Sequence, residues 1–334
     1  MDQGANQFVI ENPPADGISK VTFAPEDSSL LLVSSWDKTV NLYNVEENAL
    51  KQKFEHQAAV LDCCFSSNDR AYSGGVDRTV RELEIDTGNS RALGSHDDAV
   101  KCTNWSNLTN LLFTGSWDKT IRTWDPRSSE ALQGTYHQPH KVLSMDILED
   151  KLVVAMGNRH IYIYDVRNMN ETLQKRESSL KYMTRAVGCL PTKDGYASSS
   201  TEGRVAVEYF DPSPEVQSKK YAFKCHRQVQ NDVEVVYPVN GLAFNKVYGT
   251  FATGGSDGIV NFWDGINRKR IRQFPRYPDG ISSLAFSHDG KKLAIACSYT
   301  YDEGEKDHAP DTVYIRNLTE SECLPRSALN GKTA

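Results

Sequence analysis

Hydrophobic and polar residues alternate over short stretches of this chain, and the same arrangement returns many times. In LFTGSWDKTIRTWD (112–125), an apolar run ends in small residues, a polar turn follows, and a second alternating run closes on Asp125. Alternation with a period of two on both sides of a short polar turn predicts two strands joined as a hairpin. Further copies occupy residues 31–45, 71–85, 153–166, 197–210 and 251–264, and an interrupted copy occupies 293–299 and 312–318.

The spacing of these hairpins predicts how they assemble. Their turns lie 40, 41, 41, 43 and 55 residues apart, measured between Asp37, Asp77, Asp118, Arg159, Glu202 and Asp257. A repeat of about 40–45 residues with four short strands per unit is typical of a WD-repeat propeller. We therefore predict an all-β fold, a seven-bladed WD-repeat β-propeller that forms one domain over residues 7–318.

The two ends of this domain are predicted to meet in one blade. Residues 7–11 (QFVIE) could form a short strand, whereas the seventh repeat ends near Leu318 without a clear fourth strand. Because a closed ring leaves no exposed sheet edge, we expect this N-terminal strand, residues 8–10, to be the outer strand of blade seven. Residues 319–334 are expected to form a loose C-terminal tail.

Each blade is predicted to begin with an inner strand. The seven candidates are residues 19–23, 60–65, 100–105, 142–147, 185–190, 239–244 and 281–286. In blade three, His96 precedes the inner strand, and Thr114, Asp118 and Trp124 follow on the second strand, in the turn and on the third strand. Such a set pairs buried polar groups that are costly to leave unpaired, so we predict a structural rather than a catalytic role for it.

Two segments interrupt the repeat. Residues 211–238 insert charge and proline into blade five and explain the spacing of 55 residues; within them, 221–226 are predicted to be the outer strand of that blade. Residues 299–311 (YTYDEGEKDHAPD) separate the second and third strands of blade seven, with five carboxylates against one lysine. We expect them to form a mobile, solvated acidic loop, and whether it gates the neighbouring face stays open.

Composition excludes several classes of function. A net charge of −6 argues against a general nucleic-acid binder, and the chain shows neither a signal-peptide pattern nor an apolar run long enough to span a membrane. The seven cysteines form no Cys-x-x-Cys pair, which favours a reduced intracellular protein. His137 and His140 have no evident third ligand, and no glycine-rich phosphate loop opens a helix. We expect no metal, no cofactor and no enzymatic activity.

Several candidate binding residues are predicted to converge on one rim of the ring. In a four-stranded blade, the turn between the second and third strands lies on the same side as the beginning of the first strand. Trp36, Trp117 and Arg204 lie in such turns, and Lys181 and Arg185 lie at or just before the inner strand of blade five. The two tryptophans form either an exposed aromatic surface or rings that pack on neighbouring loops; position alone does not decide.

The cations of blade five point to an anionic ligand. Lys181, Arg185, Arg204 and Lys224 belong to this blade or precede it directly. Clustered lysine and arginine suit a carboxylate or phosphate, and each charge-assisted hydrogen bond contributes on the order of 1.5–3 kcal/mol. The alternative is an ordinary solvated basic face.

Longer stretches resemble the Bub/Rae family of WD-repeat propellers. They are residues 11–19, 31–43, 176–185, 202–227, 237–244 and 250–264. The family has a mitotic spindle-checkpoint branch and a messenger-RNA export and nuclear-pore branch of the Rae/Gle type, which share the LKY…R, EGRVA and FKCHR elements. The DPSPE (211–215) and KKYAFKCHR (219–227) runs favour the checkpoint branch. Met183 stands where the family would lead us to expect glutamine.

The resemblance implies a non-enzymatic adaptor of the spindle assembly checkpoint. Its members bind the Gle-two-binding-sequence motif of Bub and BubR checkpoint kinases and dock them on phosphorylated Met-Glu-Leu-Thr repeats of the kinetochore scaffold. It further implies a role with the anaphase-promoting complex as part of the checkpoint complex, no direct contact with nucleic acid or membrane, and a monomer by itself. Such a protein would lie in the nucleus, at kinetochores in mitosis, and in the cytoplasm.

Carried over residue by residue, the resemblance assigns two sets of binding residues. The kinase motif would meet Phe8, Trp36, Trp117, Lys181 and Arg185, and the phosphothreonine would meet Arg204 and Lys224. Two alternatives stay open. One is an export and nuclear-pore adaptor. The other is a ubiquitin-ligase substrate receptor, because WDPR (124–127) and YDVR (164–167) are similar to the WDxR pattern of such propellers.

Overall fold

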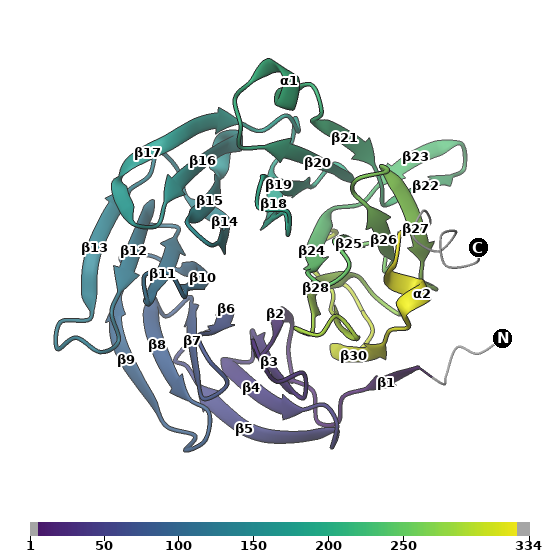
Figure 1. Cartoon of the computed structure of the whole chain (residues 1–334). Coiled ribbons are helices and arrows are strands. Elements are labelled where there is room, and N and C mark those ends of the chain that lie inside the picture. The colour runs from purple at the N-terminus through teal and green to yellow at the C-terminus, as the bar shows by residue number, and fades with distance from the viewer. Residues whose placement is uncertain (1–5, 326–334) are drawn as a thin grey trace.

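The computed structural model describes residues 6–325 and forms a ring of seven four-stranded antiparallel sheets (Figure 1). The predicted seven-bladed all-β propeller is therefore confirmed. Blade one consists of β2 (Ile18–Phe23), β3 (Leu30–Ser35), β4 (Thr39–Asn44) and β5 (Ala49–Glu55). Blade two consists of β6 (Val60–Phe65), β7 (Arg70–Gly75), β8 (Thr79–Glu84) and β9 (Ser90–Ser95). Blade three consists of β10 (Val100–Ser106), β11 (Leu111–Ser116), β12 (Thr120–Trp124) and β13 (Leu132–His137).

The remaining blades repeat this order from the channel outward. Blade four consists of β14 (Val142–Leu148), β15 (Lys151–Met156), β16 (His160–Asp165) and β17 (Asn168–Glu177), with a short 3-10 turn at Gly157–Arg159. Blade five consists of β18 (Thr184–Cys189), β19 (Gly195–Ser200), β20 (Arg204–Tyr209) and β21 (Tyr221–Lys224). Blade six consists of β24 (Val239–Asn245), β25 (Thr250–Gly255), β26 (Val260–Asp264) and β27 (Lys269–Gln273), and blade seven begins with β28 (Ile281–Phe286), β29 (Lys292–Cys297) and β30 (Thr312–Asn317).

The N-terminal strand closes the ring, as predicted. β1 (Gln7–Val9) pairs antiparallel with β30 and completes blade seven, with Phe8 opposite Ile315. The apolar core lies between neighbouring blades: Val21 and Val33 of blade one pack in one cluster with Ala294 of blade seven. Because each interface is shared by two blades, closure buries the last apolar face.

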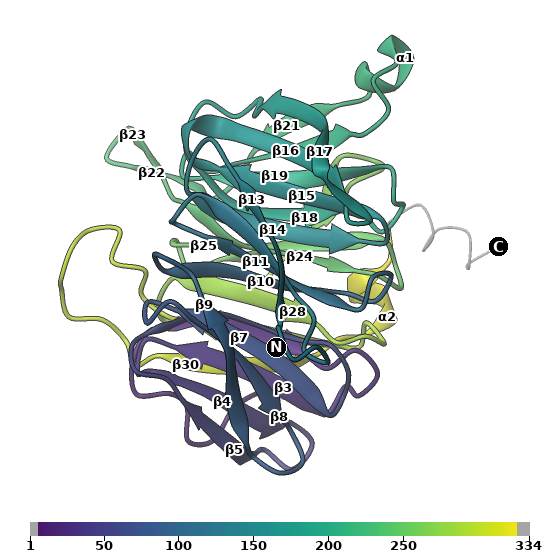
Figure 2. The same ribbon diagram turned by 90° about the vertical axis from the view of Figure 1, so that its left-hand side faces the viewer.

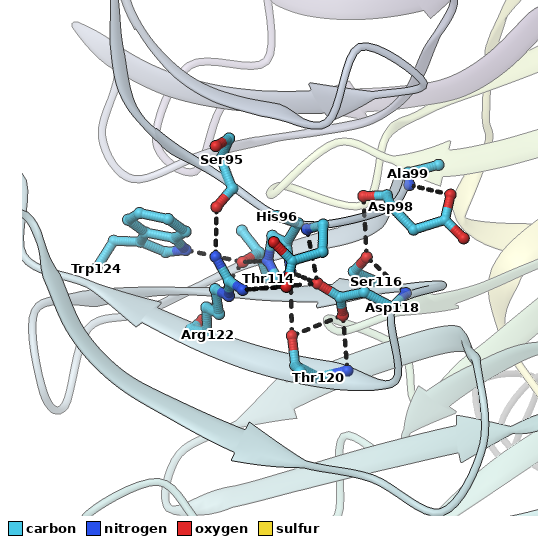
Figure 3. Close-up of polar contacts among 11 residues, drawn as sticks. Ser95, His96, Asp98, Ala99, Thr114, Ser116, Asp118, Thr120, Arg122 and Trp124 are labelled. Carbon is cyan, nitrogen blue, oxygen red and sulfur yellow. Dashed lines mark hydrogen bonds and ion pairs between the residues drawn. The ribbon is translucent and has the colours of Figure 1, made fainter.

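A chain of hydrogen bonds connects Trp124, Thr114, His96 and Asp118 and holds blade three together (Figure 3). The Trp124 indole donates to Thr114 Oγ1 (2.7 Å), the Thr114 hydroxyl donates to His96 Nε2 (2.7 Å), and His96 Nδ1 donates to Asp118 (2.8 Å). A neutral histidine satisfies every donor and acceptor in this chain. Burial, the largest cause, accordingly lowers the pKa of His96 despite the Asp118 carboxylate.

Blade six contains the same set, which the sequence analysis did not identify. His226 bonds Asp257 (2.9 Å) and Thr253 (2.8 Å), and the Trp263 indole donates to Thr253 Oγ1 (2.9 Å). In blade three the histidine lies four residues before the inner strand, whereas a hairpin separates His226 from β24. The insertion therefore gives His226 a different spacing from its inner strand, which is why the set in blade six could not be recognised by comparison with blade three.

That hairpin is the main unpredicted element of the 211–238 insertion. The insertion also contains a short helix, α1 (Pro214–Gln217), and the predicted outer strand β21. β22 (Arg227–Gln230) and β23 (Val233–Val236) then pair as a separate two-stranded sheet, joined by Asn231 and Asp232 with φ of 49° and 61°. Positive φ at both central residues is the geometry of a tight hairpin turn. The hairpin and the long connection between β29 and β30 project from the same face of the ring (Figure 2).

The acidic loop and residues 319–325 are more firmly attached than expected. Within the loop, the rings of Tyr299, Tyr301 and His308 contact one another at centroid distances of 5.1–6.0 Å, and Tyr299 is buried. Beyond blade seven, α2 (Glu320–Cys323) buries Cys323, and Glu322 pairs with Arg272 (3.1 Å) and Arg316 (2.8 Å). The expectation of a loose tail is therefore wrong for residues 319–325; residues 326–334 lie outside the described part of the chain.

Candidate functional site

A bulge at the same point of every inner strand forms the rim of the central channel. In each of the seven blades, the pairing between the first and second strands skips the second residue of the inner strand. A bulge leaves that residue out of the ladder and redirects its side chain. The skipped residues are Ser19, Leu61, Lys101, Leu143, Arg185, Asn240 and Ser282.

Six of these seven residues line one cavity, which we call the mouth cavity. It has a volume of about 270 Å³, and Trp36, Trp117 and Arg185 lie in its wall. The structure thus brings together three residues that the sequence analysis assigned to one peptide site. Tyr299 and Tyr301 of the acidic loop complete the wall.

The two tryptophans differ in their surroundings. Trp36 is 53% exposed, whereas Trp117 is half-buried and the Lys141 ammonium lies 5.3 Å from the centre of its ring. Both side chains follow a serine and precede an aspartate whose carboxylate caps the turn: Asp118 accepts from the Thr120 N–H (2.8 Å). The turn therefore fixes the backbone and leaves each indole free to contact a ligand, which favours the aromatic-surface interpretation for Trp36 above all.

Polar atoms without partners accompany the aromatic rings. Arg185 Nε, Asn240 Oδ1 and Ser282 Oγ are buried and have no hydrogen-bond partner. Buried polar groups are normally paired, so three unpaired atoms on one cavity wall indicate room for a polar ligand or water. The sequence analysis missed Asn240 and Ser282; the signal that could have found them is their position, second in each inner strand.

A second cavity, which we call the cationic cavity, lies beside blade five and has a volume of about 590 Å³. Its wall contains four cations: Lys181, Arg204, Lys224 and Arg227. Arg204 and Lys224 lie directly opposite each other in the β20–β21 pair. Like charges at opposed positions cost stability in a sheet, so this pair is better suited to binding an anion than to supporting the fold.

Two glutamates partly neutralise this cavity. Glu202 lies 3.7 Å from Arg204 and accepts from the Lys181 backbone N–H, and Glu234 of β23 pairs with Arg227 (2.8 Å) and Lys224 (3.8 Å). Four cations against two carboxylates leave an excess of two positive charges. That excess matches a dianionic phosphate. Arg227, the last residue of the FKCHR run, was missed as a site residue by the sequence analysis.

Two of the predicted site residues are placed differently from the expectation. Lys181 was grouped with the tryptophans, but it lines the cationic cavity. Phe8 is partly buried against the core between blades seven and one, and it belongs to the described wall of neither cavity. Strand β1 needs an apolar residue there to cover the core, so the ring closure itself explains Phe8.

The other sequence motifs add no site to these two cavities in the part of the chain that the structure describes. Within residues 6–325, no group of three or more histidine, cysteine or acidic side chains could hold a metal ion, and His137 and His140 therefore belong to no such group. No helix in this part of the chain is long and apolar enough to span a membrane. Arg127 donates through Nε and Nη2 to Asp125 (2.8 and 2.9 Å), so the donors of this WDxR arginine are engaged within its own turn.

The cysteines behave as small apolar residues. All seven are free, and six of them are buried. Burial, for instance, raises the pKa of the Cys63 and Cys102 thiols to about 12. A thiol that stays protonated is a poor nucleophile, which makes these residues unsuitable for catalysis.

Comparison with known proteins places this geometry in context. The WD domain, G-beta repeat family matches residues 7–44, 48–81, 89–125 and 220–264. "Mitotic checkpoint protein BUB3.1" of Arabidopsis thaliana is 51% identical over 321 residues, which cover 95% of this chain and 94% of that protein. "Poly(A)+ RNA export protein" of Schizosaccharomyces pombe is 34% identical over 327 residues, covering 95% of this chain and 92% of that protein. The solved structure of U3-55K superposes with a TM-score of 0.82 over 94% of this chain and 98% of that chain, at 18% identity, which shows a shared fold alone.

Proposed function

Because the chain belongs to the Bub3 family of mitotic checkpoint proteins, we propose that it is a non-enzymatic adaptor with two peptide sites on one face. The mouth cavity binds the Gle-two-binding-sequence motif of Bub and BubR kinases. The cationic cavity binds the phosphothreonine of the Met-Glu-Leu-Thr repeats of the kinetochore scaffold. Within this proposal, the protein also joins the anaphase-promoting complex as part of the checkpoint complex, and it moves from nucleus and cytoplasm to kinetochores in mitosis.

The observation that carries the proposal is the separation of aromatic and cationic surfaces on this face. Trp36 and Trp117 supply apolar area beside Arg185 and Lys101, which suits a peptide that combines apolar and acidic side chains. Arg204, Lys224, Arg227 and Lys181 surround a space without tryptophan, which suits a compact anion.

Phosphorylation then controls docking. A plain threonine offers no charge to the cationic cavity, whereas a phosphate adds about −1.5 to −2 at neutral pH. The excess of two positive charges there is matched by that group, so the adaptor would dock only on modified repeats.

Affinity purification from cells arrested in mitosis tests the proposal. The expected partners are checkpoint kinases and the kinetochore scaffold, and phosphatase treatment of the lysate should remove the scaffold while the kinases stay bound. Recovery of nucleoporins instead of kinases would overturn the proposal in favour of an export adaptor, and recovery of a ubiquitin-ligase adaptor would favour the third alternative.

A further inference from the structure

In the free protein, the guanidinium of Arg185 uses only part of its hydrogen-bonding capacity. Its Nη2 donates to Asp302 Oδ1 (2.9 Å), while its Nε is buried without a partner. Arg127 illustrates the complete arrangement, since both its Nε and its Nη2 donate to the one carboxylate of Asp125. A forked pair of this kind is stronger and more directional than a single bond. Arg185 therefore retains an unused donor on the edge that Asp302 already contacts.

Asp302 is fixed next to Arg185, at the wall of the mouth cavity, by blade six and by its own loop. Its second oxygen accepts from the Thr300 hydroxyl (2.6 Å) and from the Ser256 hydroxyl. Ser256 in turn accepts from the Asn240 amide (3.0 Å). The carboxylate of the acidic loop is thus held by blade six and by its own loop, and it reaches across to blade five.

We infer that Asp302 is an internal competitor for the mouth cavity. In the free protein its carboxylate occupies Arg185, and an acidic side chain of the bound peptide takes its place. This inference rests on the proposed function, because it concerns the same site and the same class of ligand, a peptide with a carboxylate next to apolar residues.

The energetics allow such an exchange. An incoming carboxylate that engages Nε and Nη2 together satisfies the buried donor that Asp302 leaves unpaired. Asp302 also borders a separate cavity of about 780 Å³, whose wall contains the cations Arg276 and Lys306 as well as the carboxylates Asp279, Glu303 and Asp307. The displaced side chain therefore has space nearby, and the exchange is driven by the forked contact at Arg185 rather than by the charge of that cavity. A ligand that offers only one weak contact gains nothing over Asp302, so the competitor raises selectivity.

The test uses two charge-neutralising variants of the full chain and a peptide with the kinase motif. Asp302→Asn removes the competing charge, and Glu305→Gln removes a like charge from an exposed position of the same loop that lies outside the walls of the mouth cavity and of the 780 Å³ cavity. Calorimetry should show Asp302→Asn binding the peptide about two- to fivefold more tightly than the wild type, the range expected for loss of one exposed ion pair. Glu305→Gln should leave the affinity unchanged.

The outcomes separate this inference from the proposed function. Equal affinities of the two variants, or weaker binding by Asp302→Asn, would overturn the inference that Asp302 competes with the peptide. Arg185→Ala serves as the third arm: if it binds the peptide as the wild type does, the mouth cavity is not the kinase-motif site and the proposed function fails. Loss of binding in Arg185→Ala together with tighter binding in Asp302→Asn supports both.

Discussion

The mouth cavity and the cationic cavity share one face of the ring, but they are built by different means. The mouth cavity uses a feature that every blade repeats, the bulged second residue of the inner strand. The cationic cavity uses blade five alone together with the inserted hairpin β22–β23. Regular repetition yields a central site with contributions from six of the seven blades, and irregular insertion yields a peripheral one that can change without disturbing the ring.

Both cavities nevertheless have one property in common. In each, a segment that interrupts the repeat provides a carboxylate to the binding cations: Asp302 of the acidic loop pairs with Arg185, and Glu234 of the hairpin pairs with Arg227 and Lys224. The interruptions thus set the charge of each site, whereas the blades set its position.

The largest effect is expected from removing the opposed cations of the cationic cavity. Arg204→Ala combined with Lys224→Ala deletes two charge-assisted contacts, so affinity for a phosphorylated Met-Glu-Leu-Thr peptide should fall on the order of a hundredfold or more. The ring should stay folded, because the pair is itself unfavourable in the sheet. Calorimetry with phosphorylated and plain peptide measures the discrimination; a retained preference for phosphate would contradict the assignment.

A smaller loss is expected in the other cavity. Trp117→Ala should weaken the kinase-motif peptide by about tenfold or more, in the range of an aromatic anchor, and leave the phosphopeptide unaffected. Trp105→Ala is unsuitable as a control because Trp105 stacks on buried Tyr72, so Leu108→Ala, an exposed apolar residue outside the mouth cavity's wall, is preferable. If Trp117→Ala and Trp36→Ala both still pull down the kinase-motif peptide, the aromatic surface is not its binding site.

Removing a negative charge from the hairpin β22–β23 should raise, rather than lower, the affinity of the cationic cavity for the phosphopeptide. Glu234→Gln frees Lys224 and Arg227, so affinity for the phosphopeptide should rise by about two- to fivefold. Glu215→Gln, an exposed glutamate of α1 in the same insertion, is the matched control. Equal effects of the two changes would mean that net charge alone, and not this pairing, governs binding.

The smallest expected effect concerns the pH dependence of folding stability, to which His96 of blade three contributes and blade five does not. Burial lowers the pKa of His96 below its ordinary value of 6.5, whereas no histidine occurs in residues 178–224 of blade five. Below pH 6.5 the unfolded chain therefore binds a proton more readily than the folded one, and stability falls as the pH drops from 6.5 toward the folded pKa. Unfolding by denaturant between pH 7 and 5 should show a shallower dependence in His96→Gln; identical slopes would contradict the buried neutral histidine.

The repeat made most of the fold predictable, because periodic hairpins at a fixed spacing leave few alternatives. The errors lie where spacing is interrupted. His226 escaped notice because the hairpin at 227–236 displaced it from its usual place, and α2 was missed because four residues with one buried cysteine carry little periodic signal.

The site was predictable only in part, for a related reason. Trp36 and Trp117 occupy corresponding turns of their blades, Arg185 lies near the start of an inner strand on the same side, and the structure brings the three together. Arg227, Asn240 and Asp302 depend on a bulge, a hairpin or a loop contact that spans more than a hundred residues, from Arg185 to Asp302. Such contacts follow from tertiary geometry, and the alternation of residue types does not encode them.

The most direct test of two separate sites on one face is a crossed binding experiment. Calorimetry would compare Arg204→Ala/Lys224→Ala and Arg185→Ala/Trp117→Ala, each against the phosphorylated scaffold peptide and the kinase-motif peptide. Each double variant should lose only the peptide of its own cavity and keep the wild-type affinity for the other. Loss of both peptides in either variant, despite an unchanged unfolding midpoint, would contradict the separation.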